Sequence, residues 1–478
     1  AQVMGAQSQN DVARPQSLFV GYKYETPQFG TLTLQAGRQV LDAHGEFQLA
    51  SVLTHHNSVS YDNFWSSARY ERRFSESLVA TASAGWSQGG PDNNEGRYLT
   101  GTNSFYFQPN DGYGAVNGSL ELDYAPASRF SVHAGVDGEY DSERILYWTK
   151  VFNAPQGKRQ PGDTLDLLDP GVARHQAITD AGTWLQVAAQ PFESLSGLHT
   201  TGTVRLDRIT YGDLRVPTQT SWRAAVAYEW SPSFVTKVIG GQAFQTPSGV
   251  MMFAQPGFGT DYNVVGNLTT PNTQALKPQR VTSVEAVATA SMFGRVSVEG
   301  GAYYQLLQDQ IEFTQLTTSF LAANRGQAAN VGVELSARVN AGRVSAYAGA
   351  SLQRGLVDGL LAANDSPEYP TAFGTAGADL DLPWGLRLNG QVRWASARGA
   401  SQSNILLNNE KAYSLPAYAT TNLTLSTVGW HLLGNKPETR LALSVRNAFD
   451  EHHFEPGYGG YDTPSLGRMW FAEIRQTF

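Results

Sequence analysis

The side chains with the clearest chemical potential are two adjacent histidine pairs, His55-His56 and His452-His453. Imidazole nitrogens are common ligands of zinc and other transition metals. The first pair lies in a segment with strand character, where neighbouring side chains point to opposite faces, so its rings cannot converge on one ion. The second pair lies beside Glu451 and Glu455 in an expected loop, where convergence is feasible. A solvated polar loop explains that group more simply, so we expect no metal site.

Other reactive groups give weaker signals. Asp163, Asp166 and Asp169 could supply oxygen ligands to Ca²⁺, but no Gly-bearing EF-hand loop surrounds them, and a solvated turn is the simpler expectation. The sequence has no cysteine, which excludes disulfides, thiolate metal sites and cysteine nucleophiles. It also has no GxSxG elbow, HExxH motif or Walker A loop. We expect neither an enzyme nor a cofactor, although catalytic groups assembled on a barrel rim would leave no such motif.

Composition narrows the class of protein further. The 478 residues are 16% charged, below the roughly 25% of ordinary soluble domains. The net charge of −8 and the lack of a basic block make nucleic acid an unexpected partner. No run of about 18 apolar residues is present, so no transmembrane helix is predicted. Alternating hydrophobicity, the signature of a membrane barrel, would escape that test.

The elements that must position any site are strands. In the closing stretch 467–478, Trp470, Ala472, Ile474 and Phe478 share one face and Glu473 and Arg475 share the other, which is the period of two of a strand. The same alternation recurs in the segments 116–124, 130–140, 222–230 and 331–340, with charges on the polar side. A soluble β-sandwich would show this pattern as well, because its polar faces meet water.

Loop lengths favour the membrane barrel over the sandwich. Tight turns are predicted at Ser75-Glu76, Pro126, Ser231-Pro232, Phe293-Gly294, Ala341-Gly342 and Pro383-Trp384-Gly385, and they alternate with long connections at 89–112, 142–175, 246–279, 356–368, 399–412 and 450–466. Outer-membrane barrels have short periplasmic turns and long extracellular loops. We predict an all-β fold: one antiparallel transmembrane β-barrel of about 20–22 strands. An even strand count would place both termini at the periplasmic end.

The alternation also assigns each side chain to a face. Residues 1–16 are expected to be a tail or linker and residues 17–478 the barrel. The side chains expected to face the lumen are Glu121, Asp123, His133, Asp137, Glu139, Arg223, Glu229, Glu285, Glu334, Arg338, Glu473 and Arg475. Those expected to face lipid include Leu120, Val132, Val226, Val333 and Ile474. Trp470, Ile474 and Phe478 are the expected assembly signal, because the final strand has to close the barrel.

Several loops carry residues that suit contact with a ligand or partner. They are Met251, Met252, Phe253, Phe258, Tyr262, His452, His453, Tyr458 and Tyr461. Exposed apolar clusters often mark binding surfaces. The alternative is that these loops pack on one another above the barrel, and the sequence does not separate the two.

A succession of short motifs in residues 220–478 resembles the TonB-dependent outer-membrane receptors. The motifs are Ala243-Phe244-Gln245-Thr246-Pro247-Ser248, Gly266-Asn267, Leu276-Lys277-Pro278-Gln279 followed by Glu285, Asn324 followed by Val331-Gly332-Val333-Glu334, Leu415-Pro416-Ala417-Tyr418, and Asn447-Ala448-Phe449-Asp450 before a strand that ends in Phe478. They are similar to that family's AFR-x-P, GNP, L-x-PE, N-x-G…GVE, LPxY and NLFD elements. Residues 1–16 resemble neither the family's plug nor its TonB box.

The resemblance implies an outer-membrane protein of a Gram-negative-type cell. Its expected function is the uptake of a scarce solute, such as a metal chelate, a vitamin or an oligosaccharide, through a plugged lumen. The alternative is a barrel of the same lineage that anchors or scaffolds other cell-envelope proteins. Expected partners are outer-membrane lipid, the barrel assembly machinery and a separate plug polypeptide or envelope protein, with a TonB-type energiser only if a plug is present.

Overall fold

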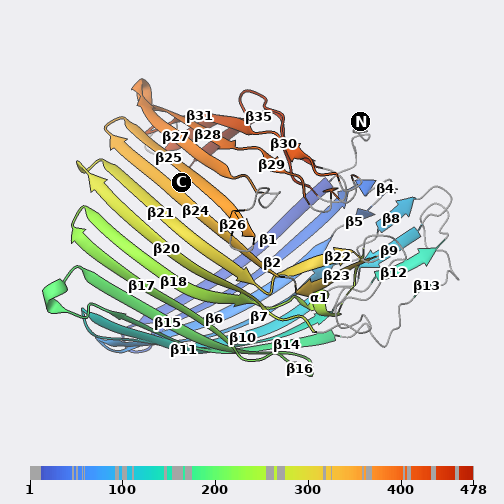
Figure 1. The fold of residues 1–478 in the computed structure, drawn as a ribbon, viewed down its shortest axis with the longest axis horizontal. Coiled ribbons are helices and arrows are strands. Elements are labelled where there is room, and N and C mark those ends of the chain that lie inside the picture. The colour runs from blue at the N-terminus through green and yellow to red at the C-terminus, as the bar shows by residue number, and fades with distance from the viewer. Residues whose placement is uncertain are drawn as a thin grey trace.

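In the computed structural model, almost every element of the chain is a strand. The structure describes the whole chain except residues 1–11, 46–47, 50–51, 56, 59, 92–95, 100–104, 110–111, 145–147, 153–164, 167–174, 254–262, 266–274, 316–318, 325, 358–359, 362–368, 402–403, 406–407, 409–410, 432–437, 458–461 and 477–478. One sheet holds 22 strands, and Figure 1 shows it curved around a central space. This confirms the predicted all-β antiparallel barrel.

The large sheet consists of β1 (Val12–Thr26), β2 (Gly30–Gly45), β5 (Asn57–Ser58), β6 (Tyr61–Ser75), β7 (Leu78–Pro91), β10 (Gly112–Ala127), β11 (Phe130–Arg144), β14 (His175–Ala189), β15 (Leu198–Tyr211), β16 (Leu214–Arg215), β17 (Gln219–Ser231), β18 (Phe234–Gln245), β20 (Gln279–Met292), β21 (Val296–Gln308), β24 (Gln327–Ala341), β25 (Val344–Val357), β26 (Leu360–Leu361), β27 (Ala372–Leu382), β28 (Leu386–Ala395), β31 (Tyr418–Thr427), β32 (Thr439–Arg446) and β35 (Met469–Gln476). Without the two-residue strands β5, β16 and β26, 19 long strands remain.

Short strands form four smaller sheets outside this wall. They are β3 (Gln48–Leu49), β4 (Val52–His55), β8 (Gly96–Leu99), β9 (Phe105–Pro109), β12 (Trp148–Phe152) and β13 (Leu165–Asp166); β19 (Asn263–Val265), β22 (Ile311–Gln315) and β23 (Ser319–Asn324); β29 (Arg398–Gly399) and β30 (Ser414–Leu415); and β33 (Phe454–Glu455) and β34 (Thr463–Pro464). The labelled helical elements are α1 (Gly249–Phe253) and the 3-10 turns η2 (Glu193–Leu195) and η4 (Pro383–Gly385). None of the helices in the described ranges is long and apolar enough to cross a membrane.

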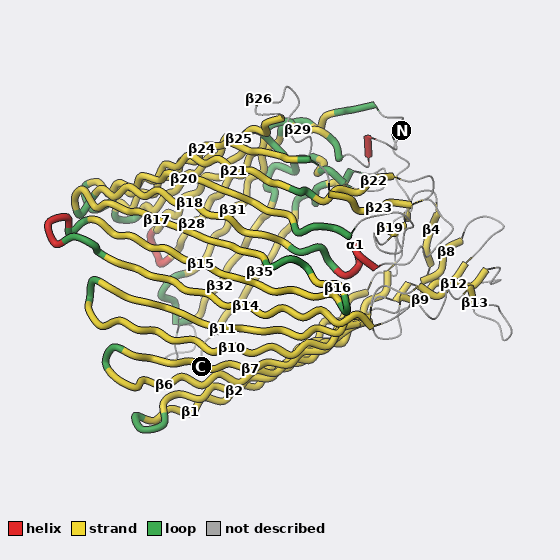
Figure 2. The backbone as a smooth tube through the Cα atoms, turned by 60° about the horizontal axis from the view of Figure 1, so that its bottom comes forward, coloured by secondary structure: helices red, strands yellow, loops and turns green. Residues whose placement is uncertain are grey.

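The two ends of the barrel differ, as the alternation of loop lengths predicts. All the tight turns, such as Thr26–Gly30 between β1 and β2, lie at one end, which we call the turn end. The small sheets and α1 gather at the other, which we call the loop end. Figure 2 shows β4, β8, β9, β12 and β13, and β19, β22, β23 and α1, on the right. Residues of the turns adopt left-handed backbone conformations where the chain reverses, as at Phe293 (φ 54°) with Gly294 and at Trp384 (φ 63°) with Gly385.

Antiparallel pairing runs without interruption from β1 to β35. Each long strand pairs with the next along the wall. The three register shifts, next to Ser75, Ala127 and Ser231, all fall at the turn end of a strand. Because no shift occurs in the middle of a strand, the alternation of faces is preserved across the whole sheet.

The first strand begins earlier than the sequence analysis predicts. β1 starts at Val12, so residues 12–16 belong to the barrel wall and not to a tail. Arg14-Pro15 suggested a break, but β1 has only one paired neighbour in the described structure, β2. Proline lacks the N–H that a second neighbour would need, and edge strands tolerate it.

The termini of the described wall lie at opposite ends. Val12 lies at the loop end, opposite His44, whereas Gln476 lies at the turn end, opposite Thr439. Both β1 and β35 therefore run from the loop end to the turn end. Among the described residues no pairing joins these two strands, so the expected closure of the last strand on the first is not seen.

The outward face of the wall is strongly apolar. Leu120, Val333, Trp470 and Ile474 are 61%, 48%, 64% and 78% exposed. In water this would be an unfavourable surface, but lipid solvates it, whereas a Lys or Arg at mid-membrane on such a face costs about 2–4 kcal/mol.

We predict that Val333→Lys, in the middle of β24, destabilises the folded barrel by about 2–4 kcal/mol. The matched control is Glu334→Lys, which places the same side chain one residue away on the opposite face. The measurement is the free energy of unfolding in urea, with the chain in lipid vesicles. Equal destabilisation by the two variants would contradict the assignment of faces.

Candidate functional site

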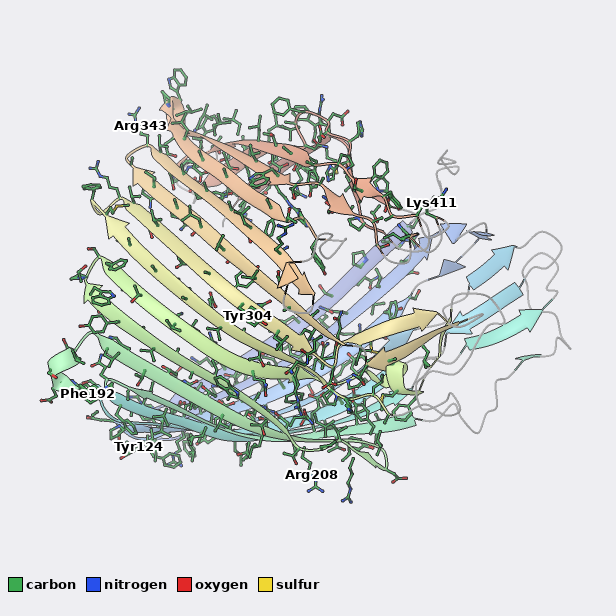
Figure 3. The ribbon with its side chains drawn as sticks, viewed as in Figure 1. Tyr124, Phe192, Arg208, Tyr304, Arg343 and Lys411 are labelled. Atoms are coloured by element: carbon green, nitrogen blue, oxygen red, sulfur yellow. The ribbon has the colours of Figure 1, made fainter. Side chains whose placement is uncertain are left out.

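The inner face of the wall is the first candidate site. Ser119 of β10 lies opposite Asp137 of β11. When the paired residues are followed from strand to strand, Arg223, Glu334 and Glu473 fall on the same face of the sheet. The register places all twelve side chains assigned to the lumen on this one face: Glu121, Asp123, His133, Asp137, Glu139, Arg223, Glu229, Glu285, Glu334, Arg338, Glu473 and Arg475. Leu120, Val132, Val226, Val333 and Ile474 lie on the other face. Arg208, also on that other face, projects away from the barrel in Figure 3.

Carboxylates cluster on the inner face of three neighbouring strands. We call this cluster the acidic wall: Asp137, Glu139 and Asp141 of β11, Asp180 of β14 and Asp207 of β15. Arg205 lies among them. Its Nη1 and Nη2 donate to both oxygens of Asp137 at 2.6 and 2.7 Å, and its Nε donates to Oδ1 of Asp207 at 2.7 Å. This bidentate geometry fixes the guanidinium group between the two carboxylates.

One arginine does not neutralise five carboxylates. The Oδ1 atom of Asp180 and the Oδ2 atom of Asp207 are buried and have no hydrogen-bond partner among the residues that the structure describes, and Asp207 is only 2% exposed. A cavity of about 480 Å³ adjoins this wall and is lined by Asp137, Glu139, Asp141 and Asp180, among others. Buried carboxylate oxygens without partners are unfavourable, so this wall is suited to receive hydrogen-bond donors or positive charge.

His133 lies toward the turn end of the acidic wall. Its Nε2 atom is 3.3 Å from Oδ1 of Asp123 and 3.7 Å from Oε2 of Glu121, and its ring meets Trp184 edge-on at a centroid distance of 4.2 Å. Sequence alternation placed His133, Glu121 and Asp123 on one face, and the structure brings the three side chains together.

The apolar loop residues around α1 form a small core. Met252 is fully buried, and it packs with Leu276 and Ala322. Met251 and Phe253 pack against this core and are partly buried. Met252 therefore follows the second of the two alternatives left open by the sequence, in which these loops pack on one another. Phe258 and Tyr262 lie outside the described residues.

Two of the short sequence motifs, the one at 243–248 and the one that includes Asn324, connect neighbouring loops to one another. In the first, the hydroxyl of Tyr211 donates to the carbonyl of Pro247 at 2.5 Å. In the second, the carboxamide of Asn324 accepts from the Lys277 N–H at 2.7 Å and donates to the Lys277 and Asp309 carbonyls at 2.9 and 2.7 Å. The carboxamide of Asn324 suits this position because one side chain both donates and accepts.

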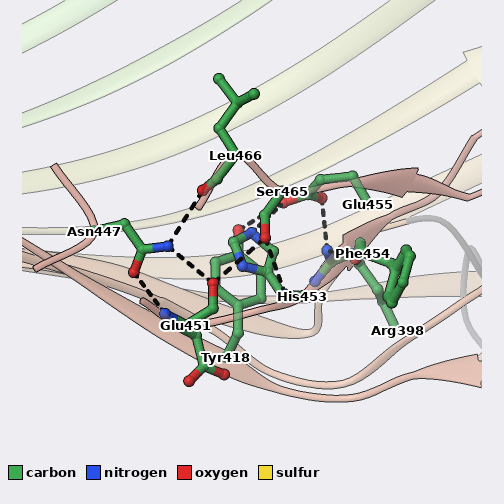
Figure 4. Close-up of polar contacts among 9 residues, drawn as sticks. All are labelled: Arg398, Tyr418, Asn447, Glu451, His453, Phe454, Glu455, Ser465 and Leu466. Atoms are coloured by element: carbon green, nitrogen blue, oxygen red, sulfur yellow. Dashed lines mark hydrogen bonds and ion pairs between the residues drawn. The ribbon is translucent and has the colours of Figure 1, made fainter. Parts of the chain in front are cut away.

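A second loop junction is built on Arg398, between β28 and β31 (Figure 4). Its side chain is only 1% exposed, and its Nη2 donates to the Phe454 carbonyl at 2.8 Å and to Oε2 of Glu455 at 2.6 Å. The other oxygen of Glu455 accepts from the Tyr418 hydroxyl at 2.8 Å. The Arg398 guanidinium lies 5.1 Å from the centroid of the Tyr418 ring. These contacts join the loop after β28 to the loop after β32.

The Asn447-Ala448-Phe449-Asp450 motif forms the turn that begins the last loop. Asn447 (φ 49°) and Asp450 (φ 59°) adopt left-handed conformations, which asparagine and aspartate tolerate better than most residues. The Asn447 carboxamide donates to the Glu451 and Leu466 carbonyls at 2.9 and 3.2 Å and accepts from the Glu451 N–H at 2.8 Å. One side chain thus holds both ends of the loop together.

The second histidine pair does not converge. His453 stacks on Tyr418 at a centroid distance of 3.7 Å, with its Nε2 atom 3.7 Å from Oε1 of Glu455. His452 is 75% exposed and lies 3.7 Å from Asp450. The two imidazoles therefore meet different carboxylates. His56 and Tyr458, like Tyr461, Asp163 and Asp169, lie outside the described residues.

Sequence reasoning missed several of the residues that organise these sites. The sequence analysis did not assign Asp180, Arg205 or Asp207 to the lumen. The segment around 204–207 does alternate, with apolar Val204 and Leu206 on one face and the two charged residues on the other. Arg398 gave no signal, because its partners at 454 and 455 are more than fifty residues away.

Burial predicts a pH dependence at the Arg398 junction. Desolvation lowers the pKa of His453 from its ordinary value of 6.5, because the stacked imidazole is buried and Arg398 opposes its protonation. The unfolded chain then binds the proton more readily than the folded one. The stability contributed by neutral His453 is present above pH 6.5 and is lost as the pH falls below it.

We therefore expect His453→Gln to weaken the fall in Tm that wild type shows between about pH 7.5 and pH 5. His452→Gln is the matched control, since His452 is exposed. The measurement is thermal unfolding in detergent followed by circular dichroism. The idea fails if both variants keep the pH dependence of wild type.

The comparisons with known proteins agree with this geometry. A family model for the TonB-dependent receptor-like β-barrel matches residues 5–448. Among curated proteins, none matches this chain. A solved structure described as a copper transporter, OprC, has a TM-score of 0.72 at 14% identity, covering 97% of this chain and 72% of that one. The ferric yersiniabactin uptake receptor FyuA of Yersinia pestis has a TM-score of 0.70 at 13% identity, over 98% of this chain and 71% of that one.

A third similar structure is the ferric citrate transporter FecA in its unliganded form, with a TM-score of 0.70 at 14% identity, over 98% of this chain and 70% of that chain. At such identities these structures support the fold alone. The family model, however, covers most of the chain, and the motifs at 243–248, 324, 415–418 and 447–450 occupy structured junctions at the loop end. The chain therefore belongs to the TonB-dependent receptor-like β-barrel family, whose members are outer-membrane proteins.

Proposed function

We propose that this barrel is the outer-membrane portion of a receptor that takes up a scarce solute through a plugged lumen. The solute class would be a metal chelate, a vitamin or an oligosaccharide. The neighbours in fold support uptake as the general activity, since they are described as a copper transporter, a ferric yersiniabactin uptake receptor and a ferric citrate transporter. Their solutes are not carried over to this chain.

The observation that carries the proposal is the polarity of the inner face. A barrel of about twenty strands encloses a lumen wide enough to pass solutes freely, and the largest transporters of this kind are plugged. The inner face presents acids, such as Glu139 and Asp180, and bases, such as Arg223 and Arg338, around the whole circumference. The buried oxygens of Asp180 and Asp207, which lack partners in the described part of the chain, would gain donors from a polar domain inserted between the walls.

A plug would also make energised uptake feasible. In this family a TonB-type energiser acts on the plug, so the partner is required only if a plug occupies the lumen. The plug would lie on a separate polypeptide or on a segment outside the described residues. The long loops, joined at Arg398 and Asn324, would then form the outer mouth through which a solute arrives.

We expect the purified 478-residue chain to form large, steady channels in planar bilayers, because its paired strands curve around a central space. Addition of a co-purifying plug polypeptide should abolish the current. The measurement is single-channel conductance, with the plug omitted as the control. A closed channel from the chain alone would mean that its own loops fill the lumen, and would end the proposal of a separate plug.

A further inference from the structure

A second cavity opens on the inner face on the other side of the barrel. It has a volume of about 300 Å³ and lies at the loop end of β20, β21, β24 and β25 and at the start of β27. That volume is at the lower end of small-molecule sites, which span roughly 300–1,000 Å³. We call it the amide pocket, for the three carboxamides described next.

The lining of the amide pocket is arranged in two rows across adjacent strands. Val281, Leu307 and Ala328 lie opposite one another and form an apolar row near the rim. One step deeper, Gln305 of β21 lies directly opposite Asn330 of β24. Side chains opposite each other in this way have Cβ atoms about 4.5–5.5 Å apart, so the carboxamides and the apolar row border the same space.

Hydrogen bonds fix the deepest carboxamide in place. The Gln353 backbone N–H donates to the Thr371 carbonyl at 2.9 Å, and its side-chain Nε2 donates to the Pro370 carbonyl at 3.1 Å. This orients its Oε1 toward the Asn330 Nδ2 at 3.4 Å and the Tyr303 hydroxyl at 3.5 Å. Gln305, in contrast, is exposed and makes no side-chain hydrogen bond within the described part of the chain. Its carboxamide is available to both donate to and accept from a ligand.

The amide pocket differs from the acidic wall in charge. Among the described residues its lining contains no carboxylate, and the ionisable side chains there are Arg354 and Tyr369. Side chains alternate between the two faces along β25. Gln353 and Gly355 lie on the inner face, so Arg354 between them points to the other side. A charged ligand would lose its hydration here without gaining an opposite charge. A pure hydrocarbon would leave the carboxamides without partners.

We infer that the amide pocket binds an uncharged, hydroxylated ring, and that its ligand class is a neutral saccharide. Such a ring has an apolar C–H face for the row of Val281, Leu307 and Ala328, and hydroxyl groups that donate and accept for Gln305 and Gln353. Tyr369 at the rim is 65% exposed and offers an aromatic face. This inference rests on the proposed uptake function and names the oligosaccharide class among its three solute classes.

The test uses the full chain in detergent micelles and takes advantage of the absence of cysteine. Thr371→Cys places one environment-sensitive fluorophore beside the pocket, and Glu139→Cys places the same fluorophore on the acidic wall. The probe is maltotriose, with citrate as the charged comparison. We expect maltotriose to cause a saturable change at position 371 and none at position 139, and citrate to cause none at position 371.

A variant pair separates a specific site from general perturbation. Gln305→Leu, in the Thr371→Cys background, should weaken the apparent affinity for maltotriose at least about fivefold through loss of a hydrogen bond. Gln391→Leu is the matched control, because Gln391 lies on the same inner face but donates to Tyr347, outside the pocket. Each variant is first checked for folding by its heat-dependent mobility on gels.

The inference is overturned if maltotriose gives no saturable change, if citrate gives an equal one, or if Gln305→Leu binds as tightly as the Gln391→Leu control. Failure of the uptake function gives a different result. If the chain binds maltotriose in micelles but supports no solute uptake in cells, the binding site stands and the proposed transport function is wrong. A chain that transports another solute without binding maltotriose keeps transport and loses the site.

Discussion

The lipid bilayer offers no water to hydrogen-bond the peptide backbone, and the rest of this structure depends on that constraint. Every N–H and C=O within the hydrocarbon region has to pair with a neighbouring strand. The long strands meet this demand by antiparallel pairing from β1 to β35, and the register shifts stay at the turn end. Because pairing fixes register, one choice of face at β10 determines which side chains face inward on β35. The inner chemistry is thus set by backbone pairing.

The same constraint bears on β1 and β35, the two edge strands of the described wall. Strands β1 and β35 run in the same direction, so direct pairing between them would be parallel. Antiparallel closure would need an odd number of strands between them. A second copy of the chain in the same membrane orientation would not supply it, since its β1 would also run parallel to β35. The edges therefore demand either a parallel seam or additional strands.

Local periodicity made much of the fold predictable. Residues such as Glu121 and Val333 could be assigned to a face because the period of two is visible within one strand. The turns at Ser75 and Phe293 could be placed because glycine and short polar residues interrupt that period. The start of β1 was misplaced because Pro15 reads as a break, although an edge strand accepts it.

Long-range loop contacts could not be predicted in this way. Met252 suited either a binding surface or packing between loops, and it is buried by Leu276, from the far end of the same connection, and by Ala322 of β23. Arg398 and Glu455 are paired across a separation that no local pattern records. Such contacts depend on how the strands bring loops together at the rim, and that arrangement follows only after the register of the whole sheet is known.

The inner face finally carries two cavities of different chemistry. On β11, β14 and β15 acidic side chains outnumber Arg205 and surround a cavity. Gln305, Asn330 and Gln353 on β21, β24 and β25 line another, whose described residues include no carboxylate. A single uniform lining would hold a plug and a solute with the same interactions, so each would compete for the same groups. Two separate cavities remove that competition, because an inserted polar domain can pair with the buried acids of the acidic wall while the amide pocket stays free. Because most residues of both cavities belong to paired strands, the separation of the two cavities is fixed by the sheet.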